Sequence, residues 1–297
     1  MSTPAPDAPA SRPRFPGLRR FGRRYAADRV AMAGAVVLAV IVGLSLLAPW
    51  IAPYPAEQLD PANRLDGPSL GHLLGTDSLG RDTFSRLLHA GRVSLSAATL
   101  AVSIAIVIGV PLGLLAGYSG GVVDWVLGRA ADALMAFPAV ILAISIVAIL
   151  GPGLGNAMVA IGVAYSPRLF RITRGASLAV RGETYVEASI SIGSSPASII
   201  ARRVVPNILA PLFVQISLMF VAALLAEAAL SLLGIGVVPP TPSWGSMLGR
   251  GFAEIRTSPI LVVVPGLTIA IVTLAFNVIG DGLRDSLGRE IRRGDDR

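Results

Sequence analysis

Between two long apolar stretches the chain reads Tyr185-Val-Glu-Ala-Ser-Ile-Ser-Ile-Gly-Ser-Ser-Pro-Ala-Ser-Ile-Ile-Ala-Arg-Arg-Val-Val-Pro-Asn207, a polar and basic insert. Residues 183–192 contain good helix formers, and Gly193 supplies the conformational freedom that a turn requires. Pro196 is suited to the first turn of a second helix. The insert therefore predicts two short helices that are joined at Gly193.

The second of these helices is expected to be amphipathic. Ile199, Ile200 and Val204 recur at spacings that build one apolar stripe, and Arg202 and Arg203 lie beside it. An apolar stripe with a cationic border suits a groove in another protein. A helix lying on lipid headgroups is the alternative, because two arginines also favour that position. These residues alone leave both interpretations open.

The composition indicates a membrane protein, since 53% of the 297 residues are apolar and only 14% are charged. A helix of about 20 apolar residues crosses the roughly 30 Å of hydrocarbon in a bilayer. The fourth of six candidate spans is long enough only if it continues to about residue 170, with Arg168 reaching toward the interface. The six spans expected are residues 30–50, 93–117, 133–150, 154–170, 208–234 and 259–280.

The arginines predict the orientation, because cytoplasmic loops accumulate positive charge. All 25 basic residues are arginines, and 19 of them fall in segments that face inward when the amino terminus is inside. Both termini and the insert are therefore expected in the cytoplasm. The chain is divided accordingly into a basic, disordered tail (1–29), a first span (30–50), an outer loop (51–92), a core (93–282) with a cytoplasmic loop (171–207), and a tail (283–297).

Several kinds of site are excluded or disfavoured by what the sequence lacks. Without any lysine, the chain has no phosphate-binding loop ending in Gly-Lys-Ser/Thr. Without cysteine, and with only two histidines, it has no thiol nucleophile and few metal ligands. Its positive charge is divided among tails and loops, which argues against nucleic-acid binding. We expect no catalytic residue, no metal and no cofactor bound by this chain.

The insert resembles the ATPase-docking loop of ABC importer permeases. That pattern runs Glu-Ala-Ala, three residues, Gly, a nine-residue spacer and an apolar-x-Leu-Pro ending. Ser189 stands in place of an alanine and Val205 in place of a leucine. The resemblance implies that this loop sits in a groove of a separate subunit, which binds ATP and Mg. The coupling residues it implies are Tyr185, Glu187, Ala188, Ser189, Gly193, Arg202, Arg203 and Pro206.

A second stretch, Leu74-Gly-Thr-Asp-Ser-Leu-Gly-Arg-Asp-Thr-Phe-Ser-Arg-Leu-Leu88, precedes the second expected span. It is similar to the signature of the second, C-type membrane subunit of dipeptide and oligopeptide permeases. One interpretation is structural: the two aspartates cap or charge a helix start and pair with Arg81 or Arg86. The other is direct contact with peptide termini. The extracytoplasmic motif comprises Thr76, Asp77, Gly80, Arg81 and Asp82, and the match extends to Ser85, Arg86, Gly91, Arg92 and Ser94.

A third similarity runs from Glu227-Ala-Ala-Leu-Ser-Leu-Leu-Gly through Pro239-Pro-Thr-Pro-Ser-Trp-Gly245, with Leu232 where the family carries phenylalanine. The stretch from Asp132 to Pro138 also resembles the start of the family's third span. An ionisable group inside a span costs a few kcal/mol and is commonly kept for a reason. Glu227 is thus expected to form a hydrogen bond with a neighbouring helix, to line the pore, or to couple transport to protons.

Two features of the spans concern packing. Gly109, Gly113 and Gly117 repeat every four residues on one helix face, which permits a close approach of another helix. Pro111 and Pro138 remove backbone hydrogen bonds and can kink their helices.

The resemblance as a whole, over residues 70–250, implies an all-helical permease of six transmembrane helices with the type I ABC importer fold. It implies a homologous B-type permease, ABC ATPase subunits and an extracytoplasmic substrate-binding protein as partners, in the bacterial cytoplasmic (inner) membrane. The substrate class it favours is di- or oligopeptides. Importers of nickel chelates, murein peptides or glutathione share this subunit type. A proton-coupled secondary carrier or a membrane-bound enzyme is the alternative from another class, but neither a charge relay nor a set of acid, base and metal ligands is visible.

Overall fold

The computed structural model describes residues 25–288, and within them the chain is helical and contains no β-strand. Of the tails expected over residues 1–29 and 283–297, residues 1–24 and 289–297 lie outside the described residues. The helices are α2 (Arg29–Leu46), α3 (Ala48–Ile51), the 3-10 turn η1 (Pro61–Asn63), α4 (Thr83–Ser119), α5 (Gly121–Met135), α6 (Ala139–Leu150), α7 (Leu154–Arg181), α8 (Thr184–Ser191), α9 (Pro196–Ile199), the π-helical segment η2 (Ile200–Val204), α10 (Val205–Leu232), α11 (Trp244–Ala253) and α12 (Ile260–Gly288).

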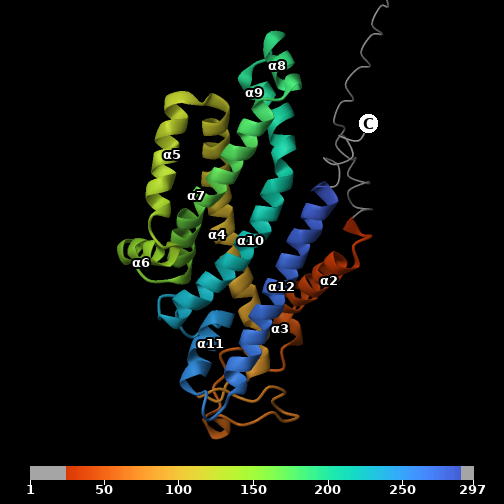
Figure 1. Ribbon diagram of the computed structural model, residues 1–297. Coiled ribbons are helices and arrows are strands. Elements are labelled where there is room, and N and C mark those ends of the chain that lie inside the picture. The colour runs from red at the N-terminus through yellow and green to blue at the C-terminus, as the bar shows by residue number, and fades with distance from the viewer. Residues whose placement is uncertain (1–24, 289–297) are drawn as a thin grey trace, which may run out of the picture.

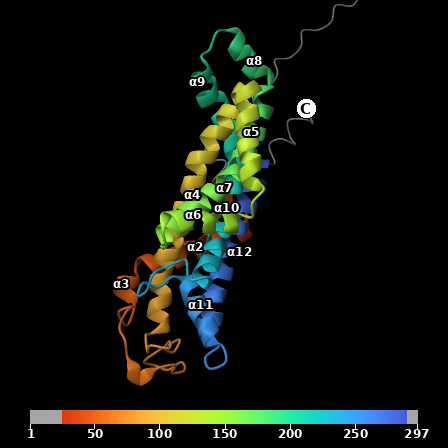
Figure 2. The same ribbon diagram turned by 90° about the vertical axis from the view of Figure 1, so that its left-hand side faces the viewer.

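These helices form an elongated bundle with two different ends (Figure 1). The short helices α8 and α9 occupy one end, which we call the turn end. The loop of residues 52–82 and helix α11 occupy the other, which we call the loop end, and Figure 2 shows the same separation from the side. The polar insert and the outer-loop motif therefore lie at opposite ends of the bundle.

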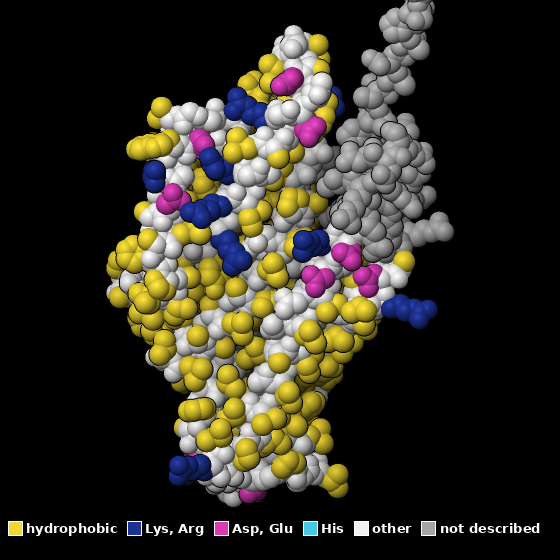
Figure 3. All heavy atoms as spheres, viewed as in Figure 1, with side chains coloured by type: hydrophobic (Ala, Val, Ile, Leu, Met, Phe, Trp, Pro, Cys, Tyr) yellow, Lys and Arg dark blue, Asp and Glu magenta, His cyan; other side chains and the backbone are white. Residues whose placement is uncertain are grey.

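Four helices are long and apolar enough to cross a membrane: α2, α4, the continuous helix Pro196–Leu232 and Ile260–Ser286 of α12. The pair α5 and α6 gives a fifth if it counts as one bent span. Helix α7 does not qualify, since its second half carries Arg168, Arg171, Arg174 and Arg181. Figure 3 shows apolar side chains across the middle of one face, with charged side chains gathered toward the turn end and at the tip of the loop end.

The prediction of one continuous span over residues 133–150 is wrong. Helix α5 ends at Met135, α6 begins at Ala139, and the two axes meet at 92°. Pro138 explains the break, because proline has no N–H to donate and its ring pushes the preceding residue out of the helical region. A proline does not always break a helix in this chain, since Pro111 lies inside α4.

Helix α4 is longer than expected. It spans 37 residues and begins at Thr83, inside the predicted outer loop, rather than at residue 93. The side chain of Asp82 caps it by accepting a hydrogen bond from the backbone N–H of Ser85 at 2.7 Å. The outer loop therefore ends at Asp82, and α4 extends the bundle into the loop end.

The close approach predicted for the glycine face of α4 is confirmed. A Cβ atom added at Gly109, Gly113 or Gly117 would lie 2.7 Å from a carbonyl oxygen of α7, and one at Gly162 of α7 would lie 2.7 Å from the Ala101 carbonyl of α4. Only glycine leaves room for two backbones at this distance. The α4–α7 pair is therefore a direct backbone-to-backbone contact in the core, surrounded by buried alanines such as Ala98 and Ala105.

Candidate functional site

The insert forms two helical segments joined at a glycine, as the sequence predicts, although the second is the start of a longer helix and not a separate short one. Helix α8 ends at Ser191, and Gly193 has φ +78°, a left-handed conformation that favours glycine. Ser195 then caps α9, its hydroxyl accepting from the N–H of Ser198 at 3.4 Å, and Pro196 occupies the first helical position. The turn between them lies at the extremity of the turn end (Figure 1).

The residues that the docking-loop resemblance assigned to coupling differ in exposure. Ser189 is buried and donates a hydrogen bond to the Tyr185 carbonyl oxygen at 2.7 Å, so it holds α8 rather than facing outward. Tyr185 and Pro206 are half-buried. The exposed ones are Glu187, Ala188, Gly193, Arg202 and Arg203.

The apolar stripe of the second helix does not face outward. Ile199 and Val204 are 2% and 0% exposed and belong to the hydrophobic core of the bundle, so this stripe is not free to enter another protein's groove. Ile190 and Ile192, on either side of the end of α8, are exposed instead at 49% and 82%. The helical spacing of α8 indicates which residues are exposed. Glu187 and Ile190 lie three residues apart on the exposed face, whereas Val186 and Ser189 lie on the buried face.

The second helix of the insert is not separate from the following span. The π-helical segment η2 carries α9 directly into α10, so residues Pro196–Leu232 form one helix. On the other side of the insert, residues 171–181 are the last turns of α7. In the cytoplasmic loop expected over 171–207, residues 171–181 and 196–207 are therefore helical extensions of the two neighbouring spans. The chain reverses direction within residues 182–195, which include α8.

Ion pairs that the sequence did not predict join α5 to α7. Arg174 forms a two-pronged contact with Asp124, with one Nη2–Oδ2 distance of 2.6 Å, and Arg171 Nη2 lies 2.5 Å from Asp132 Oδ1. The two arginines are three residues apart on α7, and so point to one side of that helix. Partners 50 and 39 positions away along the chain cannot be paired from a single sequence without knowing which helices pack together.

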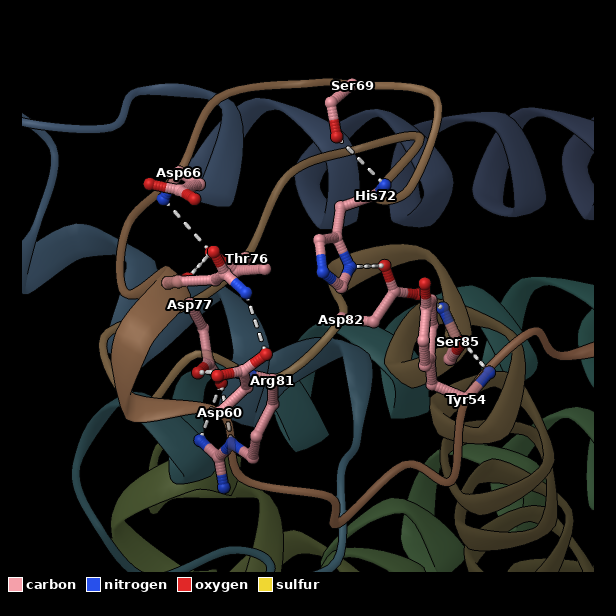
Figure 4. A network of polar contacts seen from close by, with 11 residues as sticks. Tyr54, Asp60, Asp66, Ser69, His72, Thr76, Asp77, Arg81, Asp82 and Ser85 are labelled. Carbon is pink, nitrogen blue, oxygen red and sulfur yellow. Dashed lines mark hydrogen bonds and ion pairs between the residues drawn. The ribbon is translucent and has the colours of Figure 1, made fainter.

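At the loop end, Asp77 and Asp82 organise the outer-loop motif (Figure 4). Asp77 accepts hydrogen bonds from the N–H groups of Leu79 and Arg81 at 2.8 and 3.0 Å, and its Oδ2 lies 2.7 Å from both Nε and Nη2 of Arg81. Arg86 Nε lies farther from the same carboxylate, at 3.7 Å. These contacts agree with the structural interpretation of the motif, in which the aspartates pair with Arg81 or Arg86.

The other members of the motif fix the loop against itself. Asp82 Oδ1 lies 2.9 Å from Nδ1 of His72, while its other oxygen caps α4. The Thr76 hydroxyl donates to the Asn63 carbonyl oxygen and accepts from the Asp66 N–H. Gly80 has φ +75°, and a Cβ there would lie 1.7 Å from the Asp60 carbonyl oxygen, so no other residue fits.

Glu227 lies where α4, α10 and α11 meet. Its side chain is 1% exposed and accepts hydrogen bonds from three hydroxyl groups: Ser243 at 2.7 Å, Ser231 at 3.0 Å and Ser94 at 3.2 Å. Buried polar groups of this kind are costly unless they are paired, and here each carboxylate oxygen has a partner. Among the described residues, no group of three or more His, Cys, Asp and Glu side chains is placed to hold a metal ion.

Comparison with known proteins places this chain among transport proteins. A family model described as "binding-protein-dependent transport system inner membrane component" matches residues 109–293, and one described as "N-terminal TM domain of oligopeptide transport permease C" matches residues 18–68. The first match covers the insert and the last four expected spans, and the second covers the first span and the start of the outer loop; residues 69–108 lie outside both.

Curated relatives match along nearly the whole chain. The dipeptide transport system permease protein of Alkalihalophilus pseudofirmus is 37% identical, with 98% of this chain and 97% of that protein covered. The di/tripeptide transport system permease protein of Pseudomonas aeruginosa is 42% identical, with 96% and 97% covered. The glutathione transport system permease protein of Pectobacterium atrosepticum is 38% identical, with 92% and 91% covered.

Solved structures support the fold. A structure titled as an inward-facing conformation of the MetNI methionine ABC transporter matches with a TM-score of 0.55 and 19% identity, and covers 71% of this chain and 97% of that chain. A second crystal form of the same transporter gives a TM-score of 0.51. At this identity the likeness concerns the arrangement of helices alone.

Proposed function

Because the chain belongs to the inner membrane components of binding-protein-dependent transport systems, we propose that it forms half of the pore of an ATP-driven importer for di- or oligopeptides. The protein is a multi-pass protein of the bacterial inner membrane and a permease subunit of an ABC importer. Its partners are a second, homologous B-type permease, ATPase subunits that carry ATP and Mg, and an extracytoplasmic binding protein that delivers the substrate.

The observation that carries this proposal is the α8–α9 turn. It projects at the turn end, changes direction at Gly193, and exposes the side chains of Glu187, Ile190 and Ile192. An acidic and apolar tip of this kind suits a groove in an ATPase. The coupling residues proposed are those of the docking-loop resemblance, with Ser189 holding the tip from inside and Ile190 and Ile192 added to its surface.

The topology we propose has six spans and places both termini and the turn end in the cytoplasm. In this assignment the bent pair α5 and α6 is the third span and the apolar first half of α7 is the fourth. Arginines 129, 168, 171, 174, 181, 202 and 203 belong to α5, α7 and the insert, whereas arginines 64, 81, 86, 92, 250 and 256 belong to the loop end. Positive charge favours the cytoplasmic side. Helix α12 also ends toward the turn end (Figure 1).

Transport would proceed by alternating access. ATP can drive such a change only by favouring one state over another, so its binding must stabilise the state that opens outward. The turn would carry the closure of the ATPases into α7 and α10, the two helices between which it lies. This chain performs no chemistry in the cycle; it transmits movement and lines part of the path.

Import of glutathione is a second candidate for the substrate, because relatives named as glutathione permeases are 38% and 41% identical to this chain. Glutathione is itself a peptide, so both candidates require recognition of a small, charged peptide. The binding protein, rather than this subunit, is expected to distinguish them.

The test is to purify the tagged chain in detergent and to assay the sample for co-purifying subunits and for ATP hydrolysis. We expect a second permease, an ATPase, and hydrolysis that rises when a binding protein loaded with dipeptide is added. Stimulation by glutathione but not by dipeptide would support the second candidate. A lone chain that moves solute in liposomes down a proton gradient would contradict both.

A further inference from the structure

A pocket at the loop end is formed by segments that are distant in the sequence. It lies between the 52–82 loop, the first turn of α4, helix α11 and the start of α12. The side chains that matter for its chemistry are those of Asp77, Ser78, Thr83, Arg86, Arg250 and Glu254. The outer-loop network described above supplies only one wall, so the pocket is a separate feature.

Two groups that line this pocket have no partner among the described residues. The hydroxyl of Thr83 is buried and forms no hydrogen bond there, and the residue is only 1% exposed. Arg250 is half-buried and forms no ion pair or hydrogen bond within residues 25–288. A buried hydroxyl and a partly buried guanidinium without partners are both costly, and a ligand that accepts from both would relieve that cost.

The charges around the pocket favour an anion. Burial lowers the pKa of Arg250, and the charge of Arg81 lowers it further, while Asp77 acts in the opposite direction. Asp77 cannot compensate Arg250 fully, because its oxygens are already occupied by Arg81 and by two backbone N–H groups. Arg86 lines the same pocket and lies 3.7 Å from Asp77.

Glu254 limits which anion fits. It lines the pocket, is half-buried, and forms no side-chain hydrogen bond or ion pair among the described residues. Its negative charge makes a doubly charged anion such as phosphate less favourable than a singly charged one. A planar carboxylate matches the geometry of a guanidinium and can also accept a hydrogen bond from a hydroxyl.

We propose that this pocket is a carboxylate-binding site in which Arg250 pairs with the carboxylate and Thr83 donates a hydrogen bond to it. Two sources at this face can supply the carboxylate: the C-terminus of a transported peptide, or an acidic side chain of the extracytoplasmic binding protein. The choice between these sources rests on the proposed function, whereas carboxylate binding itself does not.

The absence of cysteine makes a direct test practicable, because a single introduced cysteine is the only thiol in the chain. Ser78→Cys places a thiol in the pocket wall, at a side chain that forms no hydrogen bond in the described structure. In the full chain in nanodiscs, we expect a negatively charged methanethiosulfonate to react faster than a positively charged one. Acetate is expected to slow the reaction, and chloride at the same ionic strength is not.

Two charge variants, each made in the Ser78→Cys background, locate the effect. Arg250→Gln is expected to reduce the protection of the introduced thiol by acetate about fivefold or more, since one nearby unit charge is removed. Arg64→Gln is the matched control, because Arg64 bonds the Ser78 carbonyl oxygen at 2.7 Å but does not line the pocket. Leu70→Cys, at a fully exposed position of the same loop, reports the electrostatic potential outside the pocket. Equal protection by chloride, or protection that survives Arg250→Gln, overturns the proposal.

Assays of the assembled transporter identify the source of the carboxylate. If the peptide supplies the carboxylate, Arg250→Gln lowers uptake of peptides with a free C-terminus about tenfold and abolishes their advantage over C-terminal amides. If the binding protein supplies it, Arg250→Gln raises the concentration of binding protein needed for half-maximal ATPase stimulation, equally for both peptides. Wild-type values in both assays would show that the pocket holds only adventitious anions and would overturn the proposal.

Discussion

The backbone N–H of Trp244 donates a hydrogen bond to the hydroxyl of Ser94 at 3.0 Å, although 150 positions separate the two residues. The same hydroxyl donates to Glu227, and the indole N–H of Trp244 donates to the Leu87 carbonyl oxygen at 3.1 Å. The start of α11 is thereby fixed directly to α4, and the Ser94 hydroxyl connects this contact to the buried Glu227 carboxylate of α10. Glu227 and Trp244 are both 1% exposed, so water cannot replace these bonds.

Glu227→Ala should destabilise the protein by about 2–4 kcal/mol, because three serine hydroxyls lose their acceptor in a buried site. Glu227→Gln keeps one acceptor oxygen and should cost less, about 1 kcal/mol. Thermal unfolding of the purified chain in detergent measures both. Equal losses in the two variants would contradict a role in hydrogen bonding.

Glu227→Gln should also leave transport dependent on ATP and insensitive to a proton uncoupler. The carboxylate has serine partners, and among the described residues no second acid or histidine bonds to it, so a proton relay has no next group. Uptake into vesicles with ATP held constant tests this. If the uncoupler alone abolished uptake by the wild-type protein, proton coupling would replace the structural interpretation.

Gly113→Ala should weaken the contact between α4 and α7 by about 1–3 kcal/mol, because the new Cβ would lie 2.7 Å from the Phe170 carbonyl oxygen. Gly175→Ala is the matched control on α7, where a Cβ would meet no atom within 4 Å. That variant should be neutral or stabilise by up to about 1 kcal/mol, since alanine is the better helix former. Comparable losses at both positions would mean that close approach is not the cause.

Patterns in the sequence predict the local features of this fold well. The turn at Gly193, the cap at Asp82 and the glycine face of α4 depend on neighbours in the sequence or on one helix face. Features that depend on which helices pack together leave no such pattern, as the Asp124–Arg174 pair and the inward direction of Ile199 illustrate. Pro138 predicts a kink but not its 92° angle, because the angle depends on what α6 packs against.

Gly193→Pro should uncouple ATP hydrolysis from transport while the protein still inserts. Proline fixes φ near −65°, whereas Gly193 has φ +78°, so the tip of the insert must change direction. Gly193→Asn is the control, because asparagine tolerates the left-handed region and should retain most of the activity. The measurements are basal and stimulated ATPase rates together with peptide uptake.

Glu187→Arg should uncouple the transporter by another route, since it reverses the charge of an exposed tip residue without changing the backbone. The expected result is a loss of stimulated hydrolysis with normal membrane insertion. Normal uptake and normal stimulation in both Glu187→Arg and Gly193→Pro would remove the claim that this turn is the docking element.

Asp82→Ala should destabilise the loop end by about 1–2 kcal/mol, because it removes the cap of α4 and the partner of His72. Asp66→Ala is the control in the same loop, since the Asp66 side chain is exposed and forms no hydrogen bond in the described structure. Limited proteolysis of residues 52–82 is a suitable measurement. Equal rates of cleavage in the two variants would contradict the capping role.

The continuity of α9, η2 and α10 has a mechanical consequence. A helix of 37 residues is about 55 Å long, which exceeds the thickness of the hydrocarbon layer, so a single rod begins at the α8–α9 turn and ends beside Glu227. Pro211 lies inside this helix without ending it. Torque applied at Pro196 must therefore twist the π-helical segment, bend the helix at Pro211, or rotate its far end against the three serines that hold Glu227 in place.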